Sequence, residues 1–336
     1  MLPTNAQCGL ECVAGPNEAV PEEAHSDTHA TSIDKFSSFN IEGTQIIVTG
    51  RWLKVASVHD QEWRETNISA DCAILVDKVS QSRQVKADLF TFIQEPLDTE
   101  PRYDYPYEWE SVAVIPVMSF SDWWINRVSS DLRKDVRRAA KRGVVIRTVP
   151  FNDELVHAIM AIYNETPIRQ GRVFRHFGES FAEVKRENST YLESSQFVGA
   201  YFENELIGFL KIVYVGKIAR LMQIIAKDAH RGRRPMNALI AKAVELVAAE
   251  GSVMLTYGKY RYSQGADTVT AFKARNGFEE VLIPRYYVPL SLKGRIFVRL
   301  QLHRRFVRLM PVSVRKFLKR LRLALHQKDT AKQNTM

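Results

Sequence analysis

The sequence contains only three cysteines among 336 residues, and two of them, Cys8 and Cys12, lie in a polar N-terminal stretch. So few cysteines exclude a small disulfide-stabilised scaffold and favour a protein of a reducing compartment. No second Cys/His pair follows Cys8 and Cys12 at the spacing of a zinc site, so we predict no bound metal.

Long apolar runs are also absent, since no uninterrupted run approaches the roughly 20 residues of a membrane-spanning helix. The N-terminal residues lack the basic-then-apolar order of a secretory signal. We therefore predict a cytoplasmic protein. Peripheral contact with the inner face of the membrane is left open, because the C-terminal segment is strongly basic.

Acidic residues are scarce in the second part of the chain. Residues 1–125 contain 8 Lys and Arg against 20 Asp and Glu, a net charge of −12, whereas residues 126–336 contain 39 against 18, a net charge of +21. Clustered positive charge concentrates anions, which implies partners such as nucleotide phosphates, nucleic acid or an acidic lipid surface. The charge by itself does not choose among these partners.

The N-terminal part divides into two predicted segments. Residues 1–40 are rich in Pro, Glu, Ser and Thr and poor in large apolar side chains, so we predict a disordered leader. Residues 41–125 form a predicted small β-rich region, because short β-branched runs recur there between turns. We interpret it as a small or degenerate partner of the core. The predicted strands span residues 45–48, 53–58, 72–79, 88–93 and 112–117, and an aromatic, acidic surface loop spans 103–109.

Residues 126–291 form the predicted core, a mixed α/β domain. It opens with a helix over 127–142 that carries a cationic face and stops at Gly143. The pattern that follows predicts the order β-α-α-β-β-β-α-β-α-β. The predicted elements are strand 144–149, helices 153–165 and 178–188, strands 197–202, 206–215 and 219–226, helix 235–249, strand 253–257, helix 268–275 and strand 281–289.

Residues 292–336 form a predicted basic, amphipathic helical tail. Its second half places apolar residues at helical spacing with cations opposite, namely Val314, Phe317, Leu318, Leu321 and Leu325. Such a helix either docks its apolar stripe on the core or lies in an anionic membrane interface. The sequence leaves both interpretations open.

Two local sequences within this order resemble the GNAT superfamily of acyl-CoA N-acyltransferases. Residues 229–239, AHRGRRPMNAL, stand where the family has its Arg-Gly-x-Gly-x-Gly/Ala loop, and residues 271–279, AFKARNGFE, resemble its aromatic-x-x-x-Gly-Phe segment. A loop that opens a helix suits pyrophosphate, because the first helical amides lack partners and lie at the positive end of the dipole. The resemblance implies a GNAT fold, in which helices flank a mixed central sheet.

The same resemblance implies a set of residues that bind acyl-CoA, the donor substrate. These are Gln223, on the strand that receives the acyl carrier, and His230, Arg231, Gly232, Arg233, Arg234 and Asn237 at the loop. Arg234 and Met236 depart from the small residues that are usual there. The cations of the loop either contact phosphates directly, or the donor is not free acyl-CoA.

A closer resemblance covers residues 110–290. The stretch from Trp123 to Gly143 is similar to the helix that precedes the transferase core in the Fem-like, BioF2-like branch of the GNAT superfamily. Members of that branch add amino acids or acyl groups to cell-envelope precursors, some of them from aminoacyl-tRNA. The resemblance therefore implies a cell-envelope precursor as acceptor and keeps charged tRNA as an alternative donor.

Acylation of an amine requires a base, donors for the oxyanion and an acid for the leaving group. The resemblance places the acceptor at the connection between the first two core helices, where we predict Glu165 as the base. The predicted acceptor-binding residues are Asn164, Arg169, Gln170, Arg172 and His176. Tyr262 is the predicted acid, since a phenol of pKa about 10 can protonate a thiolate. A structural role stays open for each of these residues.

The sequence thus predicts an N-acyltransferase that moves an acyl group from a thioester donor, acyl-CoA, to an amine. The expected acceptor is a cell-envelope or exopolysaccharide precursor, linked to a lipid or a sugar. Two alternatives remain: Fem-like aminoacyl transfer from charged tRNA, and a non-catalytic GNAT-fold module that binds membrane or nucleic acid. The altered glycine loop is the feature that supports the binding module.

Overall fold

The computed structural model describes residues 37–41, 43–63, 68–169, 171–261 and 267–302. The predicted leader before Ser37, most of the predicted tail, Gln170 and Tyr262 lie outside the described residues, as does the side chain of Arg172. The first strand begins at Ser37, inside the segment predicted as leader. In the described part of the chain, no helix is both long and apolar enough to cross a membrane.

Eleven strands of the described residues form one mixed sheet, and β7 (Ile168–Arg169) pairs with β8 (Arg172–Val173) in a separate hairpin. Across the large sheet the strands are β1 (Ser37–Ile41), β2 (Thr44–Thr49), β3 (Val55–Val58), β4 (Leu89–Ile93), β13 (Glu279–Pro289), β5 (Tyr107–Pro116), β12 (Met254–Lys259), β11 (Ile218–Ala226), β10 (Glu205–Val215), β9 (Ser195–Phe202) and β6 (Val145–Val149). The mixed α/β fold class is confirmed.

The predicted order of the core elements is confirmed, except that the unpredicted β7–β8 hairpin lies between α4 and α5. Between the strands lie α4 (Asp153–Tyr163), α5 (Phe181–Asn188), α6 (Pro235–Ala249) and α7 (Asp267–Arg275). Local chemistry explains the boundaries. The Asn152 side chain accepts from the Leu155 amide at 2.9 Å and opens α4, while Glu203 and Asn204 both have positive φ and close the β9–β10 hairpin.

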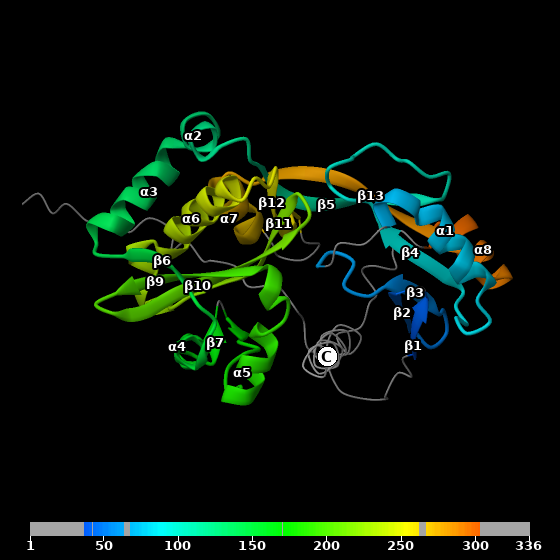
Figure 1. Ribbon diagram of the computed structural model, residues 1–336, viewed down its shortest axis with the longest axis horizontal. Helices are drawn as coiled ribbons and strands as arrows, with labels where there is room; N and C mark the ends of the chain where they lie inside the picture. The colour runs from blue at the N-terminus through cyan, green and yellow to red at the C-terminus, as the bar shows by residue number, and fades with distance from the viewer. Residues whose placement is uncertain (1–36, 42, 64–67, 170, 262–266, 303–336) are drawn as a thin grey trace, which may run out of the picture.

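Helices cover both faces of the core sheet (Figure 1). On one face, α3 (Ser130–Lys141), α6 and α7 enclose a core that includes the fully buried Trp123, which belongs to the short π-helix η1 (Trp123–Arg127) after α2 (Phe120–Asp122). On the other face, α4 and α5 pack through a second core that includes Val156, Ile159 and Phe209. The candidate site lies between these two layers, at the carboxyl ends of the central strands β11 and β12 and next to the loop that precedes α6.

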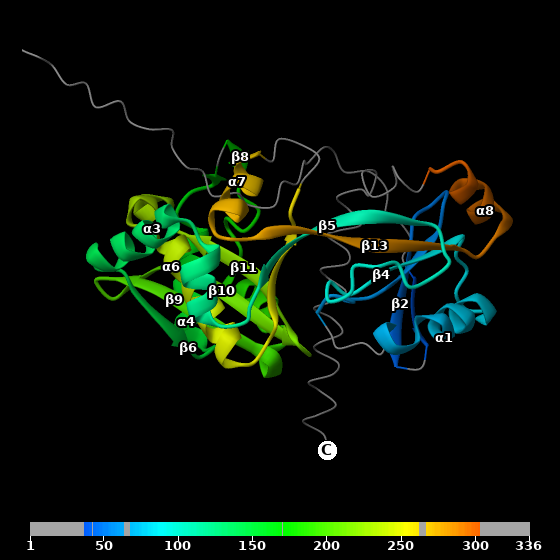
Figure 2. The ribbon, with the colours of Figure 1, turned by 90° about the horizontal axis from the view of Figure 1, so that it is seen from above.

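The N-terminal strands continue the core sheet because β5 and β13 are long enough to run through both parts of the molecule (Figure 2). β13 pairs with β5 from Glu279 to Tyr286 and with β4 from Arg285 to Pro289. Helices α1 (Ile68–Gln81) and α8 (Leu292–Arg299) lie on opposite faces of this N-terminal part (Figure 2). The β-rich region is therefore an extension of the same sheet.

Two local predictions in this region are wrong. Residues 72–79, predicted as a strand, belong to α1, and their buried side chains Cys72, Leu75, Val76 and Val79 have the i, i+3, i+4, i+7 spacing of one helix face. The β-branched composition concealed that spacing. The last three residues of the predicted aromatic loop, 107–109, belong instead to β5, because they complete its pairing with β13.

Candidate functional site

Strands β11 and β12 diverge in the middle of the sheet. They pair in parallel only from Ile218 with Met254 to Arg220 with Thr256, although β11 continues to Ala226 and β12 to Lys259. On its other side, β11 pairs with β10 through an irregular register that skips Met222, which is a β-bulge. In the described residues β12 pairs with no residue of β11 beyond Arg220, and we refer to this unpaired interval between the two strands as the opening.

The sequence-predicted residue Gln223 lies on this diverging part of β11. Its side-chain amide donates to the Tyr163 hydroxyl at 2.7 Å, and Tyr163 is buried at the end of α4. Burial raises the pKa of the Tyr163 phenol, so the phenol stays protonated at neutral pH. The side chain of Gln223 is therefore fixed by a hydrogen bond to the last residue of α4.

The loop after β11 forms a 3₁₀ helix, η3 (Asp228–Arg233), which leads into α6. Arg234 stands between them with a left-handed backbone (φ 60°) and provides no side-chain cap for α6, whose first position is Pro235. The first amides of α6 therefore have no partner from a capping side chain, and the helix dipole adds positive potential there. This arrangement matches the predicted phosphate-binding loop in position.

Helix α3 is joined to this loop by several contacts. Arg142 donates through Nη1 to the Gly232 carbonyl, and Arg233 donates through Nη1 to the Arg142 carbonyl at 2.8 Å. Arg234 Nε lies 3.4 Å from Oδ1 of Asp135, a buried carboxylate of α3. Part of the positive charge at the loop is thus already balanced within the protein.

The other residues predicted at the loop divide into two groups. His230 and Arg231 remain near the surface, where His230 Nε2 lies 3.7 Å from Glu205 and Arg231 donates to Asp228 at 2.7 Å. Asn237 is buried and donates to the Asn276 side chain at 3.0 Å, so it joins α6 to the end of α7. Its contacts favour a packing role over phosphate binding.

Glu165, the predicted base, lies beside the same loop. Its carboxylate accepts from the backbone amides of Asp228 at 2.7 Å and Ala229 at 2.9 Å, and it lies 3.5 Å from Arg169. Both carboxylate oxygens of Glu165 are thus engaged by backbone amides of the loop. The contacts favour a positioning role, in which Glu165 fixes the start of η3.

The predicted acceptor residues are held by contacts within the protein. Arg169 is buried and donates to the Ile162 carbonyl at 2.7 Å and the Ala226 carbonyl at 3.0 Å, so it joins the end of α4 to the end of β11. Asn164 accepts from the Gly178 amide at 2.8 Å. These residues shape the α4–α5 connection. Whether any of them also binds the acceptor stays a prediction.

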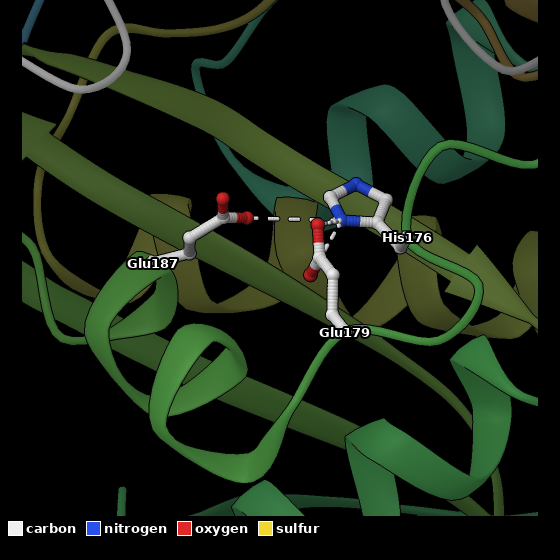
Figure 3. Close-up of side chains that lie close together, drawn as sticks. All are labelled: His176, Glu179 and Glu187. Carbon is white, nitrogen blue, oxygen red and sulfur yellow. Dashed lines mark hydrogen bonds and ion pairs between the residues drawn. The ribbon is translucent and has the colours of Figure 1, made fainter.

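His176 is buried among carboxylates (Figure 3). Its Nδ1 lies 3.0 Å from Glu179 and 3.7 Å from Glu187, and its ring stacks on Tyr163 at 4.4 Å. The three ligand atoms lie within 4.8 Å of one another, as a metal site would require. However, Arg175 donates to Nε2 at 2.9 Å, which places the proton of the neutral ring on Nδ1, where a metal would bind. The geometry favours a hydrogen-bonded support beneath Tyr163.

An ionic network missed by the sequence analysis lies next to the end of β12. Glu110 of β5 is almost fully buried, lies 3.0 Å from Lys259 of β12 and pairs with Arg285 of β13. Burial alone would raise the pKa of Glu110, but the charges of Arg285 and Lys259 and their hydrogen bonds lower it to about 2. No local pattern signals this network, because Arg285 is the single cation of β13 and strand register decides which residues of β5 it meets.

Two contacts join loops of the N-terminal region to the core. Arg220, at the last paired position of β11, donates to Glu95 at 2.5 Å. Tyr191, before β9, donates its hydroxyl to Asp60 and stacks on Trp63 at 6.5 Å between ring centroids. The N-terminal region therefore contributes side chains to the surroundings of the opening between β11 and β12.

Comparison with solved structures places this architecture beside two proteins. FemX matches at 10% identity over 79% of this chain and 89% of that chain, with a TM-score of 0.53. The C-terminal DUF2156 domain of a putative lysylphosphatidylglycerol synthetase from Agrobacterium fabrum matches at 14% identity over 79% and 87%, with a TM-score of 0.51. No family model matches the chain, and no curated protein sequence does.

The chain therefore has the GNAT fold in its Fem-like form, which confirms the predicted resemblance. A tandem GNAT protein from the clavulanic acid biosynthesis pathway also matches, at 13% identity over 78% of this chain and 85% of that chain, with a TM-score of 0.37. At these identities the likeness concerns the fold, and the reaction must be inferred from the site.

Proposed function

We propose that the protein is an acyltransferase that moves an acyl group from a thioester donor to an amine at the divergence of β11 and β12. One observation carries this proposal: the pairing of the two strands ends at Arg220 and Thr256 while both strands continue toward the start of α6. An extended donor can pair with the unpaired edge of β11, and amides at the Met222 bulge can stabilise the oxyanion of the reacting carbonyl.

For the donor we propose acyl-CoA, with its phosphates at the loop before α6. Arg231 is half-buried beside the unpaired first turn of α6, so its guanidinium can add charge-assisted hydrogen bonds to a phosphate. For the acceptor we propose an amine on a cell-envelope or exopolysaccharide precursor, approaching from the α4–α5 side where Gln223 and Tyr163 lie.

Replacing Arg231 with glutamine is expected to weaken acetyl-CoA binding at least about tenfold, since the loss of a hydrogen bond to a charged group costs about 1.5–3 kcal/mol. Calorimetric titration with acetyl-CoA, longer acyl-CoAs and free CoA measures this. Lys217→Gln is the matched control, because Lys217 is exposed at the opposite end of β11. Failure of every CoA species to bind, or equal binding by Arg231→Gln, would exclude acyl-CoA at this loop.

Replacing Glu165 with glutamine separates the two roles considered for this residue. If Glu165 positions η3, the variant keeps one oxygen acceptor for the loop amides, and kcat stays within about tenfold while the KM for the donor rises. If Glu165 is the general base, kcat falls by about 10²–10⁴-fold with an unchanged KM. Steady-state kinetics with the identified donor distinguishes these outcomes, and we expect the first.

Aminoacyl transfer from charged tRNA is a second candidate, favoured by a specific observation. Helix α3 contacts the loop through Arg142 and Asp135, and it exposes further cations next to that contact, namely Lys134, Arg137, Arg138 and Lys141. Such a row suits a nucleic-acid backbone. Salt-sensitive binding of charged tRNA that weakens in Arg137→Gln/Lys141→Gln, together with no binding of CoA, would select this candidate. Absence of binding to either donor would leave a non-catalytic module.

A further inference from the structure

Helix α8 has apolar residues on two different sides. On the inner side, Phe297 is buried against Leu53, Val55 and Leu89. Gly294 lies so close to β4 that a Cβ atom there would approach the Asp88 carbonyl oxygen to 2.0 Å. This side explains how α8 is held on the sheet. It does not explain the apolar residues of the outer side.

The outer side of α8 exposes a row of large apolar side chains. Leu292, Ile296 and Leu300, spaced by four residues, are 74%, 60% and 63% exposed. Trp52, 70% exposed, adds to this row, because the Lys293 ammonium between them lies 4.3 Å from the Trp52 ring centroid. We refer to Trp52, Leu292, Ile296 and Leu300 as the α8 face.

The turn that carries Trp52 is shaped to present it. Gly50 has a φ of 97°, and a Cβ atom at this position would lie 2.1 Å from the Leu53 carbonyl oxygen, so only glycine fits. The chain then directs Leu53 into the core and leaves Trp52 in solvent. An exposed tryptophan beside exposed aliphatic residues is typical of a surface that meets a membrane interface.

Exposed cations flank the α8 face. Arg51, Lys54, Arg295 and Arg299 are exposed, and the sequence of α8, LKGRIFVR, contains no acidic residue. The nearby carboxylate of Asp88 accepts from the Ser291 hydroxyl at 2.7 Å and lies 3.9 Å from Lys293. In the sequence after Leu302, Asp329 is the single acidic residue among many cations.

We propose that the α8 face docks on an anionic lipid surface. Its apolar side chains enter the boundary between headgroups and acyl chains, and the flanking arginines and lysines contact lipid phosphates. The positive charges that flank the α8 face attract an anionic membrane and would repel a second copy of the same face. The proposal is independent of the donor and acceptor of the reaction.

Sedimentation of the full-length protein with vesicles tests this proposal. We expect binding to vesicles of equal parts phosphatidylglycerol and phosphatidylcholine and weak binding to phosphatidylcholine alone. Ile296→Asp is expected to lower the partition coefficient by at least about tenfold, because it removes one aliphatic side chain that would enter the bilayer and adds a negative charge that the anionic lipids repel. Arg295→Gln and Arg299→Gln are each expected to lower it by about fivefold.

Met118→Asp is the matched control. Met118 is 81% exposed and lies two residues before α2, which belongs to the opposite half of the molecule from α8 (Figure 1). It should bind vesicles like the wild type. The proposal is overturned if Ile296→Asp also binds like the wild type, which would leave the tail after Leu302 as the lipid contact. It is also overturned if light scattering shows a dimer that Ile296→Asp dissociates.

Discussion

Arg285→Met is expected to lower the free energy of unfolding by about 3–5 kcal/mol, because it leaves the buried carboxylate of Glu110 without its main partner. Lys259, at 3.0 Å, compensates only in part because its side chain is 41% exposed. Urea denaturation at neutral pH measures this change. Arg261→Met is the control: Arg261 pairs with Glu280 near the surface, where such a pair contributes about 0–1 kcal/mol.

The same variant has an expected pH dependence. The pKa of Glu110 is about 2 in the folded protein and near the usual 4.5 when unfolded, so its stabilisation is fully present above about pH 4.5 and is lost as pH falls toward 2. The difference in unfolding free energy between wild type and Arg285→Met should therefore be smaller at about pH 3 than at about pH 7. A difference that is independent of pH would contradict an ionised Glu110 in the folded state.

Lys273→Met is expected to destabilise the protein by about 2–6 kcal/mol and to loosen the end of β12. The buried ammonium of Lys273 donates to the Tyr257 carbonyl at 2.7 Å and the Lys259 carbonyl at 2.6 Å. Methionine fills similar space but leaves these two carbonyls without that donor, at about 1–3 kcal/mol each. The affected backbone borders the opening between β11 and β12, so donor binding should weaken as well.

Thermal unfolding measures the loss of stability in Lys273→Met, and hydrogen exchange measures the loosening of β12. Amide protection in β12 should fall in Lys273→Met while protection in α4 is retained. Lys242→Met on α6 serves as the control, because Lys242 pairs with Glu245 at 2.7 Å with 27% of its side chain exposed, and it should change stability by less than about 1 kcal/mol. Unchanged protection in β12 would show that Lys273 does not stabilise the end of β12 where it separates from β11.

The chemistry of the candidate site was only partly predictable. The loop before α6 could be located because it follows an apolar strand and opens a long apolar helix, both of which are local patterns. The partners of its charges could not be located. Glu165 meets Asp228 and Ala229, and Arg169 meets the end of β11, only because the fold brings α4 beside η3. Glu165 and Arg169, which were predicted to act on the substrate, therefore form hydrogen bonds with backbone groups of the protein.

Local sequence patterns were enough to predict the order of the core elements and the bounds of α6, Pro235–Ala249. These features depend on periodicity and on proline and glycine at helix ends, which act over a few residues. The tertiary structure was needed to show that the buried face of α1 packs on β4, and that Glu110 pairs with Arg285, 175 positions along the chain. The packing of a helix on a distant strand and the pairing of distant charges depend on strand register across the whole sheet. A pattern of a few neighbouring residues therefore cannot predict them.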